Sequence, residues 1–181
     1  ELEPIAYYIP QYRNDSDDGK TVYGAYGPRL LAMRGTINQL DSVVALLKQS
    51  PSSRRAVIQL FNAEDIAGSE RRGEIPCTCT WQFLARDRRL HMMTYMRSND
   101  AFLGLSHDLF TFTMIQEIVA RTLDLELGTY THMVGSLHLY DKDRPKAQAY
   151  VDEGWQPTIG VAMAPMPPGN PWPAIETFLT A

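Results

Sequence analysis

The stretch LGLSHDLFTFTMIQEIV, residues 103–119, is the part of the sequence that decides the fold. From Leu109 to about Leu123 the chain has no polar face, and this pattern predicts a helix buried in the core. Asp108 stands directly before the apolar run and fits an N-cap, because a short carboxylate accepts hydrogen bonds from the first N–H groups of a helix. Ser106 fits the same position. The sequence therefore predicts a central helix with a polar cap at its start.

The segments around this helix predict a second helix and several strands. Residues 37–50 carry apolar side chains at helical spacing and end before Pro51, which predicts an amphipathic helix. Runs of β-branched and aromatic residues predict strands at residues 54–62, on both sides of the turn RDRR within residues 80–98, and at residues 132–141. Residues 13–31 predict a loop, and residues 156–173 an extended or irregular segment. Helices and strands mix without regular alternation, so the expected fold class is α+β.

Length and composition predict one globular domain spanning residues 1–181, since 44% of the residues are hydrophobic. A net charge of -4 argues against a nucleic-acid or anionic-membrane surface, which needs clustered Lys and Arg. Two cysteines, Cys77 and Cys79, are too few for a disulfide framework and show no zinc pattern, so we expect no metal and a reducing, cytoplasmic setting. No signal peptide or apolar membrane span is evident. The first residue is not Met, so we expect a longer reading frame.

Several residue groups offer chemistry. Cys77 follows Pro76 and precedes a predicted strand, so its thiolate is a candidate nucleophile, although an isolated Cys is more often a small core residue. Arg54 and Arg55 lie at one strand start, and Arg97 with Ser98 at another strand end, where planar guanidinium groups suit phosphate oxygens. Solvated charge is the alternative. His138 and Tyr140 lie two apart on a predicted strand and so point to one side, as a sugar-binding pair or as two satisfied, partly buried residues.

Taken together, these motifs resemble the thymidylate synthase family. The order is RR before a strand, PC followed by QF with Gln82 five residues after Cys77, RSND running into AFLGL, and G with HLY at residues 135–140. The match covers roughly residues 4–145. The resemblance implies a thymidylate synthase-like α+β fold with a large twisted mixed sheet. It also implies a homodimer in which two arginines of each subunit reach the partner's phosphate site, and 5,10-methylenetetrahydrofolate as one-carbon donor.

The same resemblance implies roles for individual residues. Cys77 would be the nucleophile that adds to C6 of a pyrimidine nucleotide. Phosphate would be held by Arg97 and Ser98 of one subunit and by Arg54 and Arg55 of the other. The remaining implied roles are substrate binding by Gln82, folate binding by Asp100, sugar binding by His138 and Tyr140, and an active-site tyrosine at Tyr26, with Tyr23 as the alternative.

This sequence also departs from the family pattern. Thr78 replaces the histidine of the family's PCH, and Ser136 replaces the aspartate of its GD, which puts details of water organisation in doubt. The family's catalytic glutamate is expected before residue 1, and neither Glu1 nor Glu3 is assigned to it. The family's GLPFN reads GLSHD here, so the asparagine that recognises uracil is replaced by Asp108.

Asp108 predicts a cytosine nucleotide as the substrate. Uracil shows an N3–H donor beside an O4 acceptor, which a carboxamide matches. Cytosine shows an N4 amino donor beside N3, which becomes a second donor when protonated, and a carboxylate accepts from both. A carboxylate facing uracil O4 would set two acceptors against each other. Without the resemblance, the N-cap interpretation of Asp108 would be favoured.

The substitution is similar to that in the cytidylate hydroxymethylases, a branch of the family. The predicted reaction is therefore C5 hydroxymethylation of CMP or dCMP with the folate and water, and His107 beside the base would make the pocket wetter. Ribose and deoxyribose are not distinguished by the sequence. The ribonucleotide-specific members act in bacterial nucleoside-antibiotic pathways, which leans toward CMP. The alternatives are a thymidylate synthase that methylates dUMP and a catalytically inactive nucleotide-binding homologue.

Overall fold

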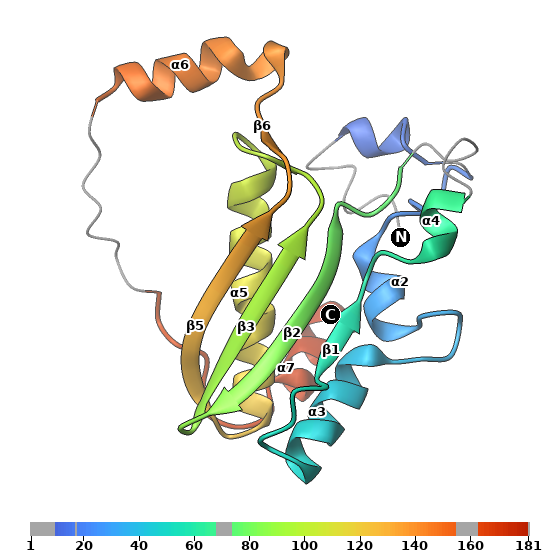
Figure 1. The fold of residues 1–181 in the computed structure, drawn as a ribbon, viewed down its shortest axis with the longest axis vertical. Helices are drawn as coiled ribbons and strands as arrows, with labels where there is room; N and C mark the ends of the chain where they lie inside the picture. Colours follow the sequence, from blue (N-terminus) through green and yellow to red (C-terminus); the bar gives the residue numbers. More distant parts are fainter. Residues whose placement is uncertain (1–9, 17, 68–73, 155–162, 181) are drawn as a thin grey trace.

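A computed structural model describes residues 10–16, 18–67, 74–154 and 163–180. These residues form a mixed four-stranded sheet of order β1-β2-β3-β5 and a two-stranded sheet of β4 and β6 (Figure 1). The strands are β1 (Val57–Gln59), β2 (Thr78–Arg86), β3 (Arg89–Met96), β4 (Asn99–Asp100), β5 (Glu126–Val134) and β6 (Leu137–His138). The helices are η1 (Pro10–Arg13), α2 (Tyr26–Leu31), α3 (Gln39–Gln49), α4 (Ala63–Ala67), α5 (Gly104–Thr122), η3 (Asp141–Asp143), α6 (Arg144–Asp152) and α7 (Trp172–Thr180). The α+β class is confirmed.

The hairpin expected around RDRR is present. β2 pairs with β3 in antiparallel register, and the last pair is Arg86 with Arg89. The two turn residues, Asp87 and Arg88, have φ of 49° and 56°. Two positive φ angles in a two-residue loop match the right-handed twist of the flanking strands, and Asp tolerates this region better than most residues. The charged turn thus closes the longest antiparallel pair of the sheet.

The core lies between one face of the four-stranded sheet and the helices behind it (Figure 1). Alternate residues of β2 and β3 point into this core, among them Trp81, Phe83 and Met92, each with 0% exposure. The ring of Phe112 on α5 meets Trp81 edge-on at 4.8 Å between centroids. α3 buries its apolar stripe against β1 as predicted, with the Asn38 side chain as its N-cap.

The apolar run of residues 109–123 forms most of α5, but two expectations about it are wrong. The helix begins at Gly104, and Asp108 lies inside it rather than at its cap. Its N-cap residue is Leu103, and the carboxylate that serves the start of the helix is Asp100, whose Oδ2 accepts hydrogen bonds from the N–H groups of Leu103 at 2.8 Å and Gly104 at 3.1 Å. Spacing along the sequence does not predict this contact, because the acceptor Asp100 lies on strand β4, four residues before the first residue of the helix.

The buried face of α5 is narrower and more polar than its sequence suggests. The Gln116 amide donates to Leu90 O at 2.8 Å, and Glu117 accepts from the backbone of Met166 at 2.7 Å. Both side chains are buried, while Phe110 is 56% exposed. Long-range backbone partners thus draw two polar residues into the core, so α5 is buried on one face rather than all round.

Three other segments differ in part from expectation. The expected loop at residues 13–31 includes the short helix α2. The strand expected at 132–141 begins earlier, at Glu126, and is divided into β5 and β6 around Gly135. A Cβ on Gly135 would lie 3.1 Å from Arg97 O and from the Tyr95 hydroxyl, so the missing side chain permits this close crossing. The end of the chain is irregular at 163–171 before α7, and residues 155–162 lie outside the described part.

The other face of the sheet is not covered by any helix of the described chain (Figure 1). It presents a mixture of apolar and polar side chains, and several are more than 40% exposed: Val57, Tyr95 and Met133. We call this surface the open face. Within the described part, no helix is long and apolar enough to cross a membrane.

Candidate active site

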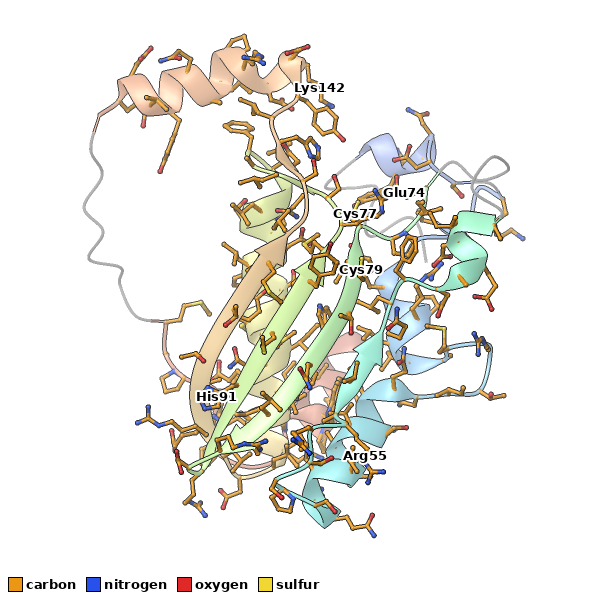
Figure 2. All side chains as sticks on the ribbon, in the orientation of Figure 1. Arg55, Glu74, Cys77, Cys79, His91 and Lys142 are labelled. Atoms are coloured by element: carbon orange, nitrogen blue, oxygen red, sulfur yellow. The ribbon has the colours of Figure 1, made fainter. Side chains whose placement is uncertain are left out.

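Cys77 and Arg97 come together because β2 and β3 are antiparallel neighbours. Cys77 directly precedes β2 and Arg97 directly follows β3, and the Arg97 backbone N–H donates to Cys77 O at 2.9 Å. The Arg97 side chain then folds over the preceding loop: Nε donates to Pro76 O at 2.9 Å and Nη2 to Ile75 O at 3.2 Å. Nη2 also lies 3.6 Å from the Cys77 sulfur. The register of one hairpin thus sets a cation beside the candidate nucleophile, and Figure 2 shows where Cys77 lies at this end of the sheet.

The environment of Cys77 has opposing effects on its thiol. Burial raises the pKa of Cys77 above its ordinary value, whereas the Arg97 charge lowers it, and the nearby carboxyls of Glu74 and Asp108 raise it. A thiolate is disfavoured where charge is poorly solvated, and a neighbouring guanidinium offsets that cost. Arg97 is therefore the group that can hold Cys77 in its nucleophilic form. Cys79, two residues on, lies in β2.

Tyr26 is joined to the same strand end by Thr78. The Tyr26 hydroxyl accepts hydrogen bonds from the Thr78 backbone N–H at 3.1 Å and from Thr78 Oγ1 at 2.9 Å. Burial raises the pKa of Tyr26, so its phenol stays protonated and keeps a proton to donate. Tyr23 is placed elsewhere: its ring lies 5.0 Å from the guanidinium of Arg29, which forms a buried ion pair with Asp65. Tyr26, not Tyr23, is the tyrosine beside Cys77.

The short β4–β6 pair gathers the other polar residues of the motifs. Ser98 Oγ lies 3.4 Å from His138 Nδ1, and the rings of His138 and Tyr140 meet edge-on at 4.8 Å between centroids. Asp100 pairs with His138 in register, and its hydrogen bonds from the first N–H groups of α5 hold the pKa of its carboxyl below the ordinary value, against the effect of burial. Residues that separate motifs assign to phosphate, sugar and folate thus lie together in and beside one two-stranded ribbon.

Asp108 reaches this cluster from the second turn of α5. Asn99 Nδ2 donates a short hydrogen bond to Asp108 Oδ2. Burial raises the pKa of Asp108 to about 6, although the Asn99 hydrogen bond and the His107 charge lower it. The Asp108 charge in turn raises the pKa of Tyr26 and Cys77, which places the three groups in one electrostatic environment. A half-buried carboxylate therefore faces the candidate nucleophile.

Three predicted site residues are not brought to Cys77 within the chain. Arg54 and Arg55 are exposed before β1, and Figure 2 shows Arg55 toward the opposite end of the sheet from Cys77. Gln82 lies on the open face, beside Val57 in register, and its Nε2 donates to Arg54 O at 2.9 Å. If these residues serve a site, that site belongs to another subunit.

Two residues of the cluster carry no role in the motif analysis. Thr78 is fully buried and orients Tyr26, and Asn99 is 3% exposed and orients Asp108. The signal for Thr78 was its position directly after the nucleophile, where the family has another polar residue. The signal for Asn99 was its place between Ser98 and Asp100, two residues with implied roles.

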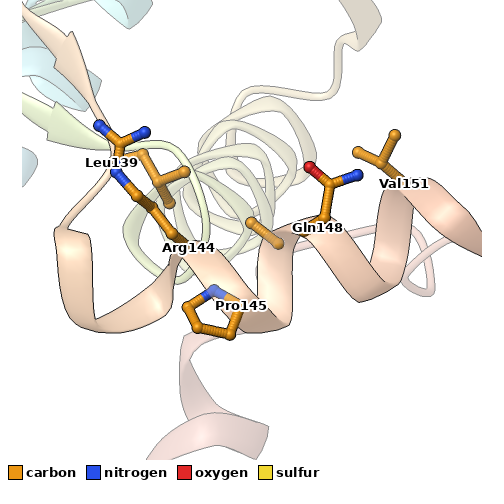
Figure 3. Close-up of a pocket in the computed structure, with 6 residues that line it drawn as sticks. Leu139, Arg144, Pro145, Gln148 and Val151 are labelled. Atoms are coloured by element: carbon orange, nitrogen blue, oxygen red, sulfur yellow. The ribbon is translucent and has the colours of Figure 1, made fainter.

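One surface hollow is separate from this cluster. It has a volume of about 470 Å³ and lies between Leu139 and α6, lined by Arg144, Pro145, Gln148 and Val151 (Figure 3). No residue of the cluster lines it, and its walls offer few polar groups pointing to one place. Convergent polar side chains, rather than size alone, identify a binding site, so the cluster around Cys77 is the candidate active site.

Comparison with known proteins identifies the family of this chain. The family model described as thymidylate synthase matches residues 7–164. Two curated relatives named thymidylate synthase, from Listeria monocytogenes serotype 4a (strain HCC23) and serotype 4b (strain F2365), are each 34% identical over 106 residues, which is 59% of this chain and 33% of the relative. The chain thus spans about one third of the length of these relatives. The fold, the motif order and the family match together show that this chain belongs to the thymidylate synthase family.

Proposed function

We propose that this protein hydroxymethylates C5 of a cytidine nucleotide, CMP or dCMP, with 5,10-methylenetetrahydrofolate and water as co-substrates. The observation that carries this proposal is the Asp108 carboxylate, half-buried beside the Cys77 cluster and held by Asn99. Cytosine reading requires a group that only accepts hydrogen bonds, and an ionised carboxylate is such a group. The curated relatives are named for thymidylate synthesis, so methylation of dUMP is the competing function.

The base edge and Asp108 are complementary in the proposed complex. Asn99 occupies one lone pair of Oδ2, which leaves the rest of the carboxylate to accept from cytosine N4–H and from N3–H once N3 is protonated. Uracil O4 would meet the same carboxylate as a second acceptor, a mismatch of about 1 to 3 kcal/mol in a site shielded from water. The preference for cytosine thus follows from one functional group.

The proposed chemistry begins at Cys77. Its thiolate, supported by Arg97 at 3.6 Å, adds to C6 of the pyrimidine and makes C5 nucleophilic. Asp108 stabilises the positive charge that develops on N3 during this addition. Arg97 and Ser98 would hold the phosphate, and His138 with Tyr140 the sugar. All four residues lie in the β4–β6 ribbon or within two residues of it, and Arg97 also contacts Cys77.

The folate would bind on the Asp100 side of the cluster. Asp100 Oδ2 is committed to the start of α5, whereas Oδ1 has only a 3.4 Å contact with the Phe102 N–H, so it can accept from an N–H group of a pterin. When bound, methylenetetrahydrofolate supplies the one-carbon unit. His107 is exposed next to Asp108 and favours water at the mouth of the pocket, which suits a hydroxymethyl product.

We propose further that the active enzyme is a homodimer. The open face is wide and partly apolar, as expected of a surface that pairs with a second copy. Arg54 and Arg55 are exposed at its margin, and among the described residues neither guanidinium has a hydrogen-bond or ion-pair partner. Two such exposed cations are suited to a phosphate in the partner's site.

The test is the Asp108→Asn variant of the full-length protein. The wild type should convert CMP or dCMP to the 5-hydroxymethyl nucleotide and release tetrahydrofolate. Asp108→Asn should shift preference toward a uracil nucleotide by roughly 10- to 100-fold, the range of 1 to 3 kcal/mol for one edge mismatch. Ser106→Asn, two residues before Asp108 on the first turn of α5, where Ser106 is exposed, is the matched control and should keep the wild-type preference.

Product identity separates the two branches. Methylation consumes a hydride from the folate and leaves dihydrofolate, whereas hydroxymethylation leaves tetrahydrofolate. A wild-type enzyme that prefers dUMP and forms dihydrofolate in equal amount to product would overturn both the cytosine assignment and the hydroxymethylase assignment.

A further inference from the structure

Both the backbone and the side chain of Asn99 are held in place by contacts within the chain. Its backbone N–H donates to Ser136 O at 3.0 Å in the β4–β6 ribbon, and its side chain is 97% buried, being only 3% exposed. Nδ2 donates to Asp108 Oδ2 and lies 3.3 Å from the sulfur of Met96. Oδ1 is buried and has no hydrogen-bond partner in the described part of the chain. The amide therefore has one strong polar partner, the Asp108 carboxylate.

This contact distinguishes the two ends of the amide. If the amide turned by half a rotation, Oδ1 would face an ionised Asp108, and two acceptors would oppose each other. Asn99 is 3% exposed, and its Nδ2 also lies 3.3 Å from the sulfur of Met96, so its neighbours enclose the amide. The side chain has little room to leave this position, so the donor is aimed at the carboxylate by packing.

We propose that Asn99 is a specificity-determining positioning residue, which holds the Asp108 carboxylate ionised and oriented for the edge of a cytosine base. This inference rests on the proposed function for its substrate. It adds a residue to which no role was assigned, and it explains how a carboxylate can be kept charged in a half-buried place.

Among the described residues, Asn99 is the side chain that donates a hydrogen bond to Asp108, and the other nearby ionisable groups act on it through charge. Around the carboxylate lie His107 on α5, Tyr12 of η1, Tyr26 of α2, Cys77 before β2 and Tyr130 of β5. His107 contributes favourable charge, whereas an ionised Cys77 would repel Asp108. Burial raises the pKa of Asp108, and the Asn99 hydrogen bond opposes this rise. Removal of the Asn99 amide should therefore let the pKa of Asp108 rise further.

Asn99→Leu is the sharpest variant. Leu has the same branched skeleton of four side-chain heavy atoms as Asn and removes a buried oxygen that has no partner among the described residues, so the fold should tolerate it. The matched control is Gln116→Leu, which removes another buried amide from the core, one that donates to Leu90 O and Thr129 O rather than to Asp108. Thermal unfolding should show both variants folded.

The first readout needs no substrate. In nucleotide-free full-length protein labelled with ¹³C at the aspartate carboxyl, the Asp108 signal, identified by its absence in Asp108→Asn, should titrate near pH 6 in the wild type. In Asn99→Leu its midpoint should rise by about one unit, a tenfold change in the acid constant typical of one lost charge-assisted hydrogen bond. Gln116→Leu should titrate as the wild type does.

The second readout is kinetic. For the cytidine nucleotide, the acid limb of kcat/KM of Asn99→Leu should move upward by about one unit, so that kcat/KM falls about twofold at pH 7 and about tenfold well below pH 6, while Gln116→Leu keeps the wild-type pH profile. An unchanged Asp108 midpoint in Asn99→Leu, or an equal shift in Gln116→Leu, would overturn the inference. Failure of the wild type to use CMP or dCMP would instead overturn the proposed function and leave the titration result to decide whether Asn99 positions Asp108.

Discussion

The two ends of the sheet place their arginines in opposite environments. Where β2 begins and β3 ends, Arg97 is half-buried and donates to two carbonyl oxygens and the Cys77 sulfur. Where β1 begins, Arg54 and Arg55 are exposed. A guanidinium whose donors are already directed by its own chain is part of a preformed site, whereas one that points to solvent can serve a partner. The chain thus contains a preformed Cys77–Arg97 region at one end of the sheet and, at the other end, two exposed arginines that can complete the site of a partner.

The largest effect is expected at the Cys77–Arg97 end of the sheet. Cys77→Ala should reduce kcat by about 10⁴-fold or more, as removal of a nucleophile does in other enzymes, whereas Cys79→Ala should stay within a few-fold of the wild type. A 5-fluoropyrimidine nucleotide with the folate should form a covalent adduct on Cys77, located by peptide mapping. An adduct on Cys79 would reverse the assignment.

Mixing two variants tests whether Arg54 and Arg55 serve the site of a second subunit. Cys77→Ala and Arg55→Ala should each be nearly inactive, but mixed dimers would contain one site with both groups intact. Random exchange should restore about a quarter of the wild-type activity, because half of the dimers are mixed and each has one complete site of two. Exchange of subunits must be shown by mass spectrometry. Exchange without recovery would contradict shared sites.

The next comparison is between the two ends of β3. Arg97→Leu removes the cation that favours the Cys77 thiolate, so the pKa of Cys77 should rise further above its ordinary value. Alkylation by iodoacetamide at pH 8 should slow by about tenfold, a change of one unit in pKa. Arg89→Leu, at the exposed start of the same strand, should leave the rate unchanged. Equal slowing in both variants would mean that the effect is not local.

The smallest effect concerns stability. The pKa of Asp108 in the folded protein is about 6, above its ordinary 3.8. The protonated carboxyl therefore contributes most to the free energy of unfolding below about pH 3.8, and this contribution is lost as the pH rises to about 6. Asp108→Asn cannot ionise and escapes this loss. Its unfolding temperature relative to the wild type should therefore increase by a few degrees between pH 5 and pH 8, measured by calorimetry. A difference that shrinks over this range would contradict the buried carboxylate.

Local patterns explain which elements were predictable. The α3 helix and the β2–β3 hairpin depend on neighbours in sequence: an apolar stripe behind an Asn cap, and a two-residue turn that accepts positive φ. The start of α5 was not predictable in the same way. Asp100 and Asp108 are both suitable caps by residue type, and the choice depends on the β4–β6 ribbon, which brings Asp100 to the first turn.

The sequence by itself determined the family motifs, the α+β class and the candidate roles of Cys77, Arg97 and Asp108, because residue type and order along the chain carry that information. Only the tertiary structure decided that Thr78 orients Tyr26, that Asn99 orients Asp108, and that Arg55 lies away from Cys77 of its own chain. The physical reason is that strand register and burial act between residues distant in sequence. A hydrogen-bond donor acquires its function from the acceptor that folding places before it.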